Sequence, residues 1–259
     1  MTGSEQNSSP QRVQLQPAFL LHHRPYRETS RILEFFTRER GRLTLFARGS
    51  RSAKGQLNSV LQPFNKLLIS WSGRGDAGNL TGAELDGVAQ RMPAQRSLSG
   101  LYMNELLIAV LHRHDPQVEV FDLYARTLDA LRTVAEEARA LRIFEKRLLD
   151  SLGYGVSLER EALTGAAIEA SCVYRYRVDQ GFVAVDGVAE GSLLFSGASL
   201  LALAREELPD AASRADARRL MRAALDHCLE GRELRSREIL LELRRLNSAA
   251  GHSKRSSEV

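Results

Sequence analysis

The spacing of apolar residues changes between residues 85 and 97, and this change divides the chain into two parts. Up to residue 85, short runs alternate between apolar and polar positions, as half-buried strands do. In residues 42–48, Leu43, Leu45 and Ala47 share one face, and polar or aromatic residues share the other. The alternation predicts five strands, over residues 16–22, 31–37, 42–48, 66–71 and 80–85.

From residue 97 on, the apolar spacing is helical. Residues 103, 106, 107, 110 and 111 are all apolar, which gives a helix one apolar face. Glycines at 153 and 155 predict the end of a later helix. The pattern predicts helices over residues 97–114, 118–133, 136–152, 199–207, 213–230 and 236–247, with a β-hairpin over residues 172–178 and 182–185.

These elements predict an α+β protein. Five short strands within about 75 residues suit a small closed barrel of the OB-fold type. We therefore expect an OB-fold domain over residues 12–88 and a mainly α-helical domain over residues 97–247, with a β-hairpin insert at 156–190. Residues 1–11 and 248–259 are polar and are expected to be disordered; the first of them lack the apolar core of a signal peptide.

Charge is concentrated in the predicted barrel. Residues 10–75 hold twelve Arg or Lys and three Glu, so this segment carries +9 although the whole chain carries only +4. The remainder therefore carries −5. A basic segment on an otherwise acidic chain is typical of a surface that meets phosphates. Because the charge follows the strands, the sequence favours nucleic-acid binding by a small β-domain.

The loop over residues 48–55 is the best candidate for a phosphate contact, because small residues separate its three cations. Phe46 is predicted to share a strand face with Arg42 and Arg48, where a base could stack on it, although core packing accounts for most aromatic side chains. Trp71 is the weaker aromatic candidate for the same reason. The predicted DNA-binding residues are Arg24, Arg27, Arg42, Phe46, Arg48, Arg51, Lys54, Lys66 and Arg74.

No pattern demands catalysis or a bound metal. The glycines of residues 73–78 match G-x-G-x-x-G, but a strand rather than a helix follows them, so a hairpin loop is the better interpretation. His112, His114 and Asp115 lie at a predicted helix end, where capping or plain exposure is the simpler interpretation. Two cysteines, Cys172 and Cys228, exclude a four-thiolate zinc site within this chain and fit a reduced, cytoplasmic protein. No run approaches the ~18 apolar residues of a membrane span.

The ordered motifs resemble the RecO family of bacterial DNA-repair proteins from about residue 16 to 246. The matching stretches are AFLLHHRPYRETSRILEFFTRERGRL (18–43), ARGSR (47–51), LQPF (61–64), SGLYMNELL (99–107), ALRIFEKRLLDSLGYG (140–155), YRYRVDQGF (174–182) and LRSREIL (234–240). The resemblance implies an N-terminal OB-fold, a helical C-terminal domain and a non-catalytic recombination mediator. Such a mediator binds single- and double-stranded DNA, anneals complementary strands and, with RecR, helps RecA load onto DNA coated with the single-stranded-DNA-binding protein, SSB. A cytoplasmic, nucleoid-associated location follows.

Two further expectations depend on this resemblance. Many members carry four cysteines after the GYG turn, whereas this chain has only Cys172 there, so neither zinc nor another cofactor is expected. The acidic, Phe-ended tail of SSB needs an apolar pocket and a nearby cation, and the helix over residues 136–152 suggests both. The predicted tail-binding residues are Leu141, Arg142, Phe144, Lys146 and Leu148. For Arg142, the alternatives are a solvated helix face or an intramolecular pair with Glu145 or Asp150.

Two other function classes stay open. One is an RNA-binding OB-fold protein whose helical part is a scaffold. The other is a metal-dependent nuclease with an acidic site assembled from distant carboxylates. A preference for RNA over DNA would favour the first, and metal-dependent turnover of DNA would favour the second.

Overall fold

The computed structural model describes residues 11–50, 56–74, 77–133, 137–185, 193–239 and 242. The described residues fall into two compact units. The first comprises the residues up to Ala125 together with those from Leu234 on, and the second comprises Arg126–Glu233. Among the described residues, no helix combines the length and the apolar character that crossing a membrane would require.

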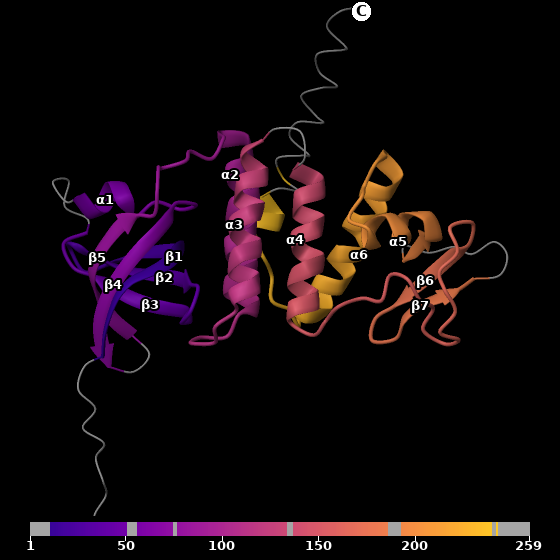
Figure 1. The fold of residues 1–259 in the computed structure, drawn as a ribbon, viewed down its shortest axis with the longest axis horizontal. Helices are drawn as coiled ribbons and strands as arrows, with labels where there is room; N and C mark the ends of the chain where they lie inside the picture. The colour runs from indigo at the N-terminus through magenta and orange to yellow at the C-terminus, as the bar shows by residue number, and fades with distance from the viewer. Residues whose placement is uncertain are drawn as a thin grey trace, which may run out of the picture. The chain divides into compact units, whose positions relative to one another are not determined.

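A closed five-stranded barrel forms most of the first unit (Figure 1). Its strands follow the order β1-β2-β3-β5-β4, and all neighbouring pairs are antiparallel except β3 and β5, which run parallel. A short helix, α1, follows β3 and packs against β5. The bounds are β1 Gln11–Tyr26, β2 Ser30–Thr37, β3 Gly41–Ala47, α1 Gln56–Val60, β4 Lys66–Arg74 and β5 Ala77–Leu85.

The long first strand closes the barrel. β1 pairs with β2 through residues 18–26 and with β4 through residues 11–19, and its register shifts at two irregularities that let the strand bend. Alternate residues point inward, as the sequence pattern predicts, and fill the interior. The buried cluster comprises Ala18, Leu20, Leu33, Phe35, Leu43, Leu45, Ala47, Leu61, Leu67 and Ile69.

Helices α2 (Ala94–Val110) and the first half of α3 (Val118–Arg132) complete the first unit. A buried chain of hydrogen bonds joins them to β1: the amide of Asn104 donates to the Leu21 carbonyl over 2.9 Å, and the Tyr124 hydroxyl donates to Asn104 Oδ1 over 2.5 Å. The Glu105 carboxylate accepts bonds from the backbone N–H groups of Arg235 and Ser236. This carboxylate therefore caps the helical segment 235–239 and holds it to α2.

The second unit combines helices with a small sheet (Figure 1). Helix α4 packs against α6, which also packs against α5. Asp210 and Ser213 form a reciprocal capping box at the start of α6. The bounds are α4 Glu137–Ser151, β6 Val173–Arg177, β7 Gly181–Ala184, β8 Leu194–Ser196, α5 Gly197–Ala204 and α6 Ala211–Cys228.

The predicted fold class is confirmed: an N-terminal β-barrel of OB-fold type precedes a helical part. The predicted hairpin is present as β6 and β7, but a third strand, β8, pairs with the other edge of β6. The pattern misses β8 because three residues are too few to show alternation, and it misses α1 because five residues are too few to show a helical period.

Candidate nucleic-acid interface

One side of the barrel carries a basic, an aliphatic and an aromatic side chain in register across three strands. Arg24 of β1 lies opposite Ile32 of β2, which in turn lies opposite Phe46 of β3. Directly opposed residues point to the same face of a sheet, and the neighbours Leu45 and Ala47 fill the core. Arg24, Ile32 and Phe46 therefore all face outward.

Aromatic rings and cations gather at the end of this outer face. The rings of Tyr26 and Phe46 lie 5.3 Å apart, and the Arg27 guanidinium lies over the Tyr26 ring, 5.2 Å from its centroid. Arg27 belongs to the turn between β1 and β2, and the exposed Arg48 follows β3 directly. We call Arg24, Tyr26, Arg27, Phe46 and Arg48 the aromatic–basic patch.

The buried Arg31 positions one edge of this patch. Its guanidinium donates to the Ser50 carbonyl and to Asn58 Oδ1, each over 2.5 Å, and so ties the segment after β3 to α1. The Ser50 hydroxyl donates to the Ala47 carbonyl over 2.9 Å and fixes the turn that carries Arg48. From the sequence, Arg31 is one of the twelve basic residues of the barrel segment. Its burial and its hydrogen bonds show that it holds the backbone under the patch in place and does not itself face solvent.

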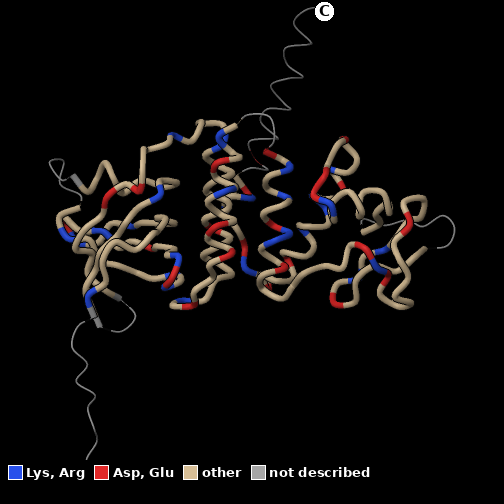
Figure 2. Tube along the Cα trace, viewed as in Figure 1, with Lys and Arg blue, Asp and Glu red and all other residues tan. Residues whose placement is uncertain are grey.

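Basic positions of the barrel are drawn blue in Figure 2. The arginines supply the positive charge of the patch, whereas His23, the neighbour of Arg24 on β1, does not. Partial burial, followed by the charges of Arg31 and His22, lowers the pKa of His23 below 6.5. His23 is therefore mostly neutral at pH 7.

Two predicted DNA-binding residues lie outside the patch and are engaged with other parts of the chain. Arg42 pairs with Glu34 at 2.5 Å and donates to the Leu111 carbonyl over 3.1 Å, so its guanidinium is largely covered. Lys66 begins β4 and pairs with Asp86 at 2.8 Å. Both cations therefore have an acidic partner within the molecule, and their contact with DNA stays a prediction.

For the remaining predicted DNA-binding residues, the structure describes no side chain. Arg51 and Lys54 lie outside the described residues. Arg74 ends β4, and nothing is described of its side chain. Trp71, the weaker aromatic candidate, packs against the core of the barrel. The structure thus brings together Arg24, Arg27, Phe46 and Arg48 from the predicted set.

The apolar stripe predicted to receive the SSB tail is not open. Phe144 and Leu148 have no exposed surface, and Leu141 is only 9% exposed. These side chains are core residues of the second unit, in which α4 packs against α6. The prediction of an accessible pocket at these three positions is therefore wrong, because the helical period identifies an apolar face but not what covers it.

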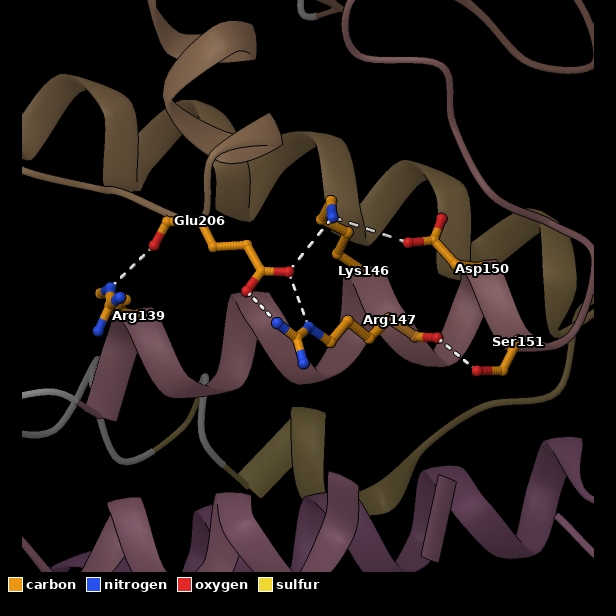
Figure 3. Close-up of polar contacts among 6 residues, drawn as sticks. All are labelled: Arg139, Lys146, Arg147, Asp150, Ser151 and Glu206. Carbon is orange, nitrogen blue, oxygen red and sulfur yellow. Dashed lines mark hydrogen bonds and ion pairs between the residues drawn. The ribbon is translucent and has the colours of Figure 1, made fainter. Parts of the chain in front are cut away.

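The two cations proposed beside that stripe are paired within the chain. Arg142 lies 2.6 Å from the buried carboxylate of Glu145, as the alternative interpretation expects. Lys146 lies 3.4 Å from Glu206, which Arg147 also holds through two hydrogen bonds, and 3.8 Å from Asp150 (Figure 3). Neither cation is free to bind an acidic peptide without giving up an internal partner.

Glu206 makes the stability of the second unit sensitive to acid. Its hydrogen bonds with Arg147, together with the charges of Arg147 and Lys146, lower its pKa below the ordinary value of 4.5 despite partial burial. The stabilisation is therefore fully present above pH 4.5 and is lost as the pH falls through the folded-state pKa. We expect Glu206→Gln to lower the melting temperature at pH 7, and the difference from wild type to shrink as the pH falls below 4.5. Thermal unfolding across pH tests this; a gap that is constant with pH would contradict it.

No metal centre emerges from the part of the chain that the structure describes. It contains no group of three or more His, Cys, Asp or Glu side chains arranged to hold a metal ion. Cys172 and Cys228 are both free thiols. His112, His114 and Asp115 are exposed in the loop between α2 and α3. The expected lack of zinc stays a prediction, which elemental analysis of the purified protein would test.

Comparison with known proteins gives matches to both parts of the chain. Residues 13–87 match the family model described as Recombination protein O N terminal, and residues 94–238 match Recombination protein O C terminal. The chain is 43% identical over 230 residues to the DNA repair protein RecO of Methylococcus capsulatus, a match covering 89% of this chain and 94% of that protein. It is also 43% identical over 244 residues to the DNA repair protein RecO of Nitrosococcus oceani. That match covers 94% of this chain and 99% of that protein.

Proposed function

The chain belongs to the RecO family of DNA repair proteins, and from this premise we propose that it binds single- and double-stranded DNA and anneals complementary strands. We also propose that it works with RecR to help RecA load onto SSB-coated DNA. In this role the protein is a mediator without catalytic activity or cofactor. Since DNA is the proposed ligand, a cytoplasmic, nucleoid-associated location follows.

The aromatic–basic patch is the observation that carries the DNA-binding part of this proposal. OB-folds bind oligonucleotides across the face of strands 2 and 3 and with the loop between strands 1 and 2. In this barrel, Phe46 lies on β3, Tyr26 ends β1 and Arg27 occupies the turn that follows. Aromatic faces stack with bases whatever the sequence, and arginines bind phosphates. The patch therefore suits single strands of any sequence.

Strand annealing follows from the same chemistry. Two DNA strands repel each other through their phosphates, and a basic surface that holds one strand lowers the repulsion felt by a second. Stacking on the patch would hold a strand without occupying the hydrogen-bonding edges of its bases, so these edges remain available for pairing. The interactions with SSB and RecR rest on family membership alone. For SSB, the burial of Phe144 and Leu148 argues for a docking site other than this face of α4.

A strand-annealing assay with two complementary labelled oligonucleotides, with and without SSB, tests the proposal. We expect the protein to accelerate annealing at 50 mM salt. If only the three arginines of the patch contact phosphates, DNA affinity should fall about 20-fold between 50 and 200 mM salt, because each contact with a single strand contributes about 0.7 to the slope.

Three outcomes would contradict the proposal. If the protein does not accelerate annealing at low salt, the proposed strand-annealing activity is wrong. Tighter binding to RNA than to DNA of the same sequence would favour the RNA-binding alternative. Shortening of the DNA in the presence of Mg²⁺ would favour the nuclease.

A further inference from the structure

The loop between α2 and α3, residues 111–117, lies along the edge of β3. The backbone N–H of His114 donates to the Arg42 carbonyl over 2.9 Å, and Arg113 forms a parallel bridge with Arg42. Close packing here requires a glycine: a Cβ on Gly41 would lie 2.2 Å from the Asp115 carbonyl oxygen. The loop thus fits directly against the first residues of β3.

The α2–α3 loop extends the outer face of the barrel beyond the end of the β3–β5 pairing. β2 occupies one edge of β3, and β5 pairs with the other edge only from Thr44 to Phe46. The loop takes the same edge at Arg42, where β5 has diverged. Residue 113 therefore occupies a position that a further strand would occupy next to β3.

The side chain of Arg113 lies on the same face as Arg42, because both reach one carboxylate. Arg42 Nη1 lies 2.5 Å from Glu34 Oε1, Arg113 Nη2 lies 3.6 Å from Glu34 Oε2, and the Thr44 hydroxyl donates to Oε2 over 2.9 Å. Arg42 and Glu34 are 14% and 12% exposed, whereas Arg113 is 48% exposed. Arg113 is thus the outermost charge of this group.

The group carries a net positive charge. Two guanidinium groups share one carboxylate, and the 3.6 Å contact of Arg113 is longer than a normal hydrogen bond. Glu34 therefore orients Arg113 without occupying its donors closely. An arginine held in this way, half exposed and only partly compensated, is suited to binding a phosphate.

The spacing between Arg113 and the aromatic–basic patch suits one DNA strand. Arg113 lies beside Arg42, and Arg42 lies four positions before Phe46, which at ~3.4 Å per residue is about 14 Å along β3. That distance corresponds to about four stacked nucleotides at ~3.4 Å each. It lies within the site sizes of about 4–16 nucleotides that single OB-folds cover.

We propose that Arg113 of the α2–α3 loop is a phosphate contact that extends the DNA site of the barrel along β3, with Glu34 as the residue that orients it and limits its charge. The inference rests on the proposed DNA-binding function. It assigns part of the DNA site to a loop of the helical region.

Affinity for single-stranded oligothymidylates of 3 to 12 nucleotides, measured by fluorescence anisotropy at low salt, tests the inference. Arg113→Ala should bind oligonucleotides of eight or more nucleotides about fivefold more weakly than wild type and lower the salt slope by about 0.7, with little change for the shortest. Arg113→Lys should retain most of the affinity, because a charge remains. Glu34→Gln should bind the longer oligonucleotides more tightly, because a negative charge leaves the face while the amide oxygen can still accept a hydrogen bond and orient Arg113.

The control is Arg126→Ala, which removes an exposed arginine of α3 and should leave affinity unchanged. Equal binding by wild type and Arg113→Ala at every length would overturn the inference, and so would an equal loss in Arg113→Ala and Arg113→Lys. Weaker binding by a folded Glu34→Gln would overturn it as well. Failure of the wild-type protein to bind any oligonucleotide would instead overturn the proposed function.

Discussion

The triple variant Arg24→Ala, Arg27→Ala, Arg48→Ala is expected to bind single-stranded DNA up to about 100-fold more weakly than wild type at low salt. Each exposed arginine that meets a phosphate contributes up to about 1 kcal/mol, and 1.4 kcal/mol is about tenfold in affinity. The Arg27 guanidinium lies over the Tyr26 ring, whereas Arg24 and Arg48 lie two positions from Tyr26 and Phe46 in the sequence. The variant should fold normally, because the patch lies outside the barrel core.

Binding isotherms between 50 and 300 mM salt measure both the loss and its cause. The slope of log affinity against log salt should become shallower by about 2, since each contact with a single strand contributes about 0.7. The matched control removes three exposed arginines elsewhere, Arg126, Arg175 and Arg222. If both triple variants lose affinity equally, net charge and not the patch determines binding.

Phe121→Ala is expected to lower the free energy of unfolding of the first unit by about 3–5 kcal/mol, the usual cost of truncating a buried phenylalanine. The ring of Phe121, on α3, lies 5.1 Å from the ring of Phe19 on β1 and 5.4 Å from that of Phe36 on β2. The substitution would leave a cavity between helix and barrel that these rings cannot fill.

Urea unfolding followed by circular dichroism and by the fluorescence of Trp71 in the barrel measures this loss. Val118→Ala, an exposed position at the start of the same helix, is the control and should cost less than about 1 kcal/mol. A loss below 1 kcal/mol in Phe121→Ala would mean that α3 contributes little to the stability of the first unit.

The barrel is the part of the fold that local pattern specifies best. In β3, the buried residues Leu43, Leu45 and Ala47 alternate with outward-facing ones, and this period survives folding because one face must pack inside the barrel. The same alternation places Phe46 outward, where Tyr26 packs beside it. Strand periodicity alone therefore identifies Phe46 as an outward-facing residue of the aromatic–basic patch.

Local sequence patterns cannot predict the surroundings of a side chain whose partners lie far away in the sequence. Arg42 shares the outward face with Phe46, but its guanidinium contacts Leu111, which lies 69 residues away in sequence. Nothing local in the sequence indicates that the α2–α3 loop packs there. The buried Arg31 illustrates the same limit, since its partners Ser50 and Asn58 become neighbours only when the barrel and α1 form.

The helical part shows a different limit. The period of α4 correctly predicts an amphipathic helix, but an apolar stripe is the same whether a neighbouring helix or a partner protein covers it. Here Phe144 and Leu148 are core residues, and Lys146 pairs with Glu206, which follows α5. A cation beside an apolar helix stripe therefore indicates a binding site only where the stripe and the cation are both exposed in the folded chain.

Amide hydrogen exchange of the full-length protein, with and without a bound 12-nucleotide single strand, shows whether the barrel face binds DNA. We expect DNA to slow exchange in residues 24–27 and 46–48 and in the α2–α3 loop, while exchange in α5 and α6 remains unchanged. Protection confined to the second unit, with the barrel face exchanging as in the free protein, would contradict it.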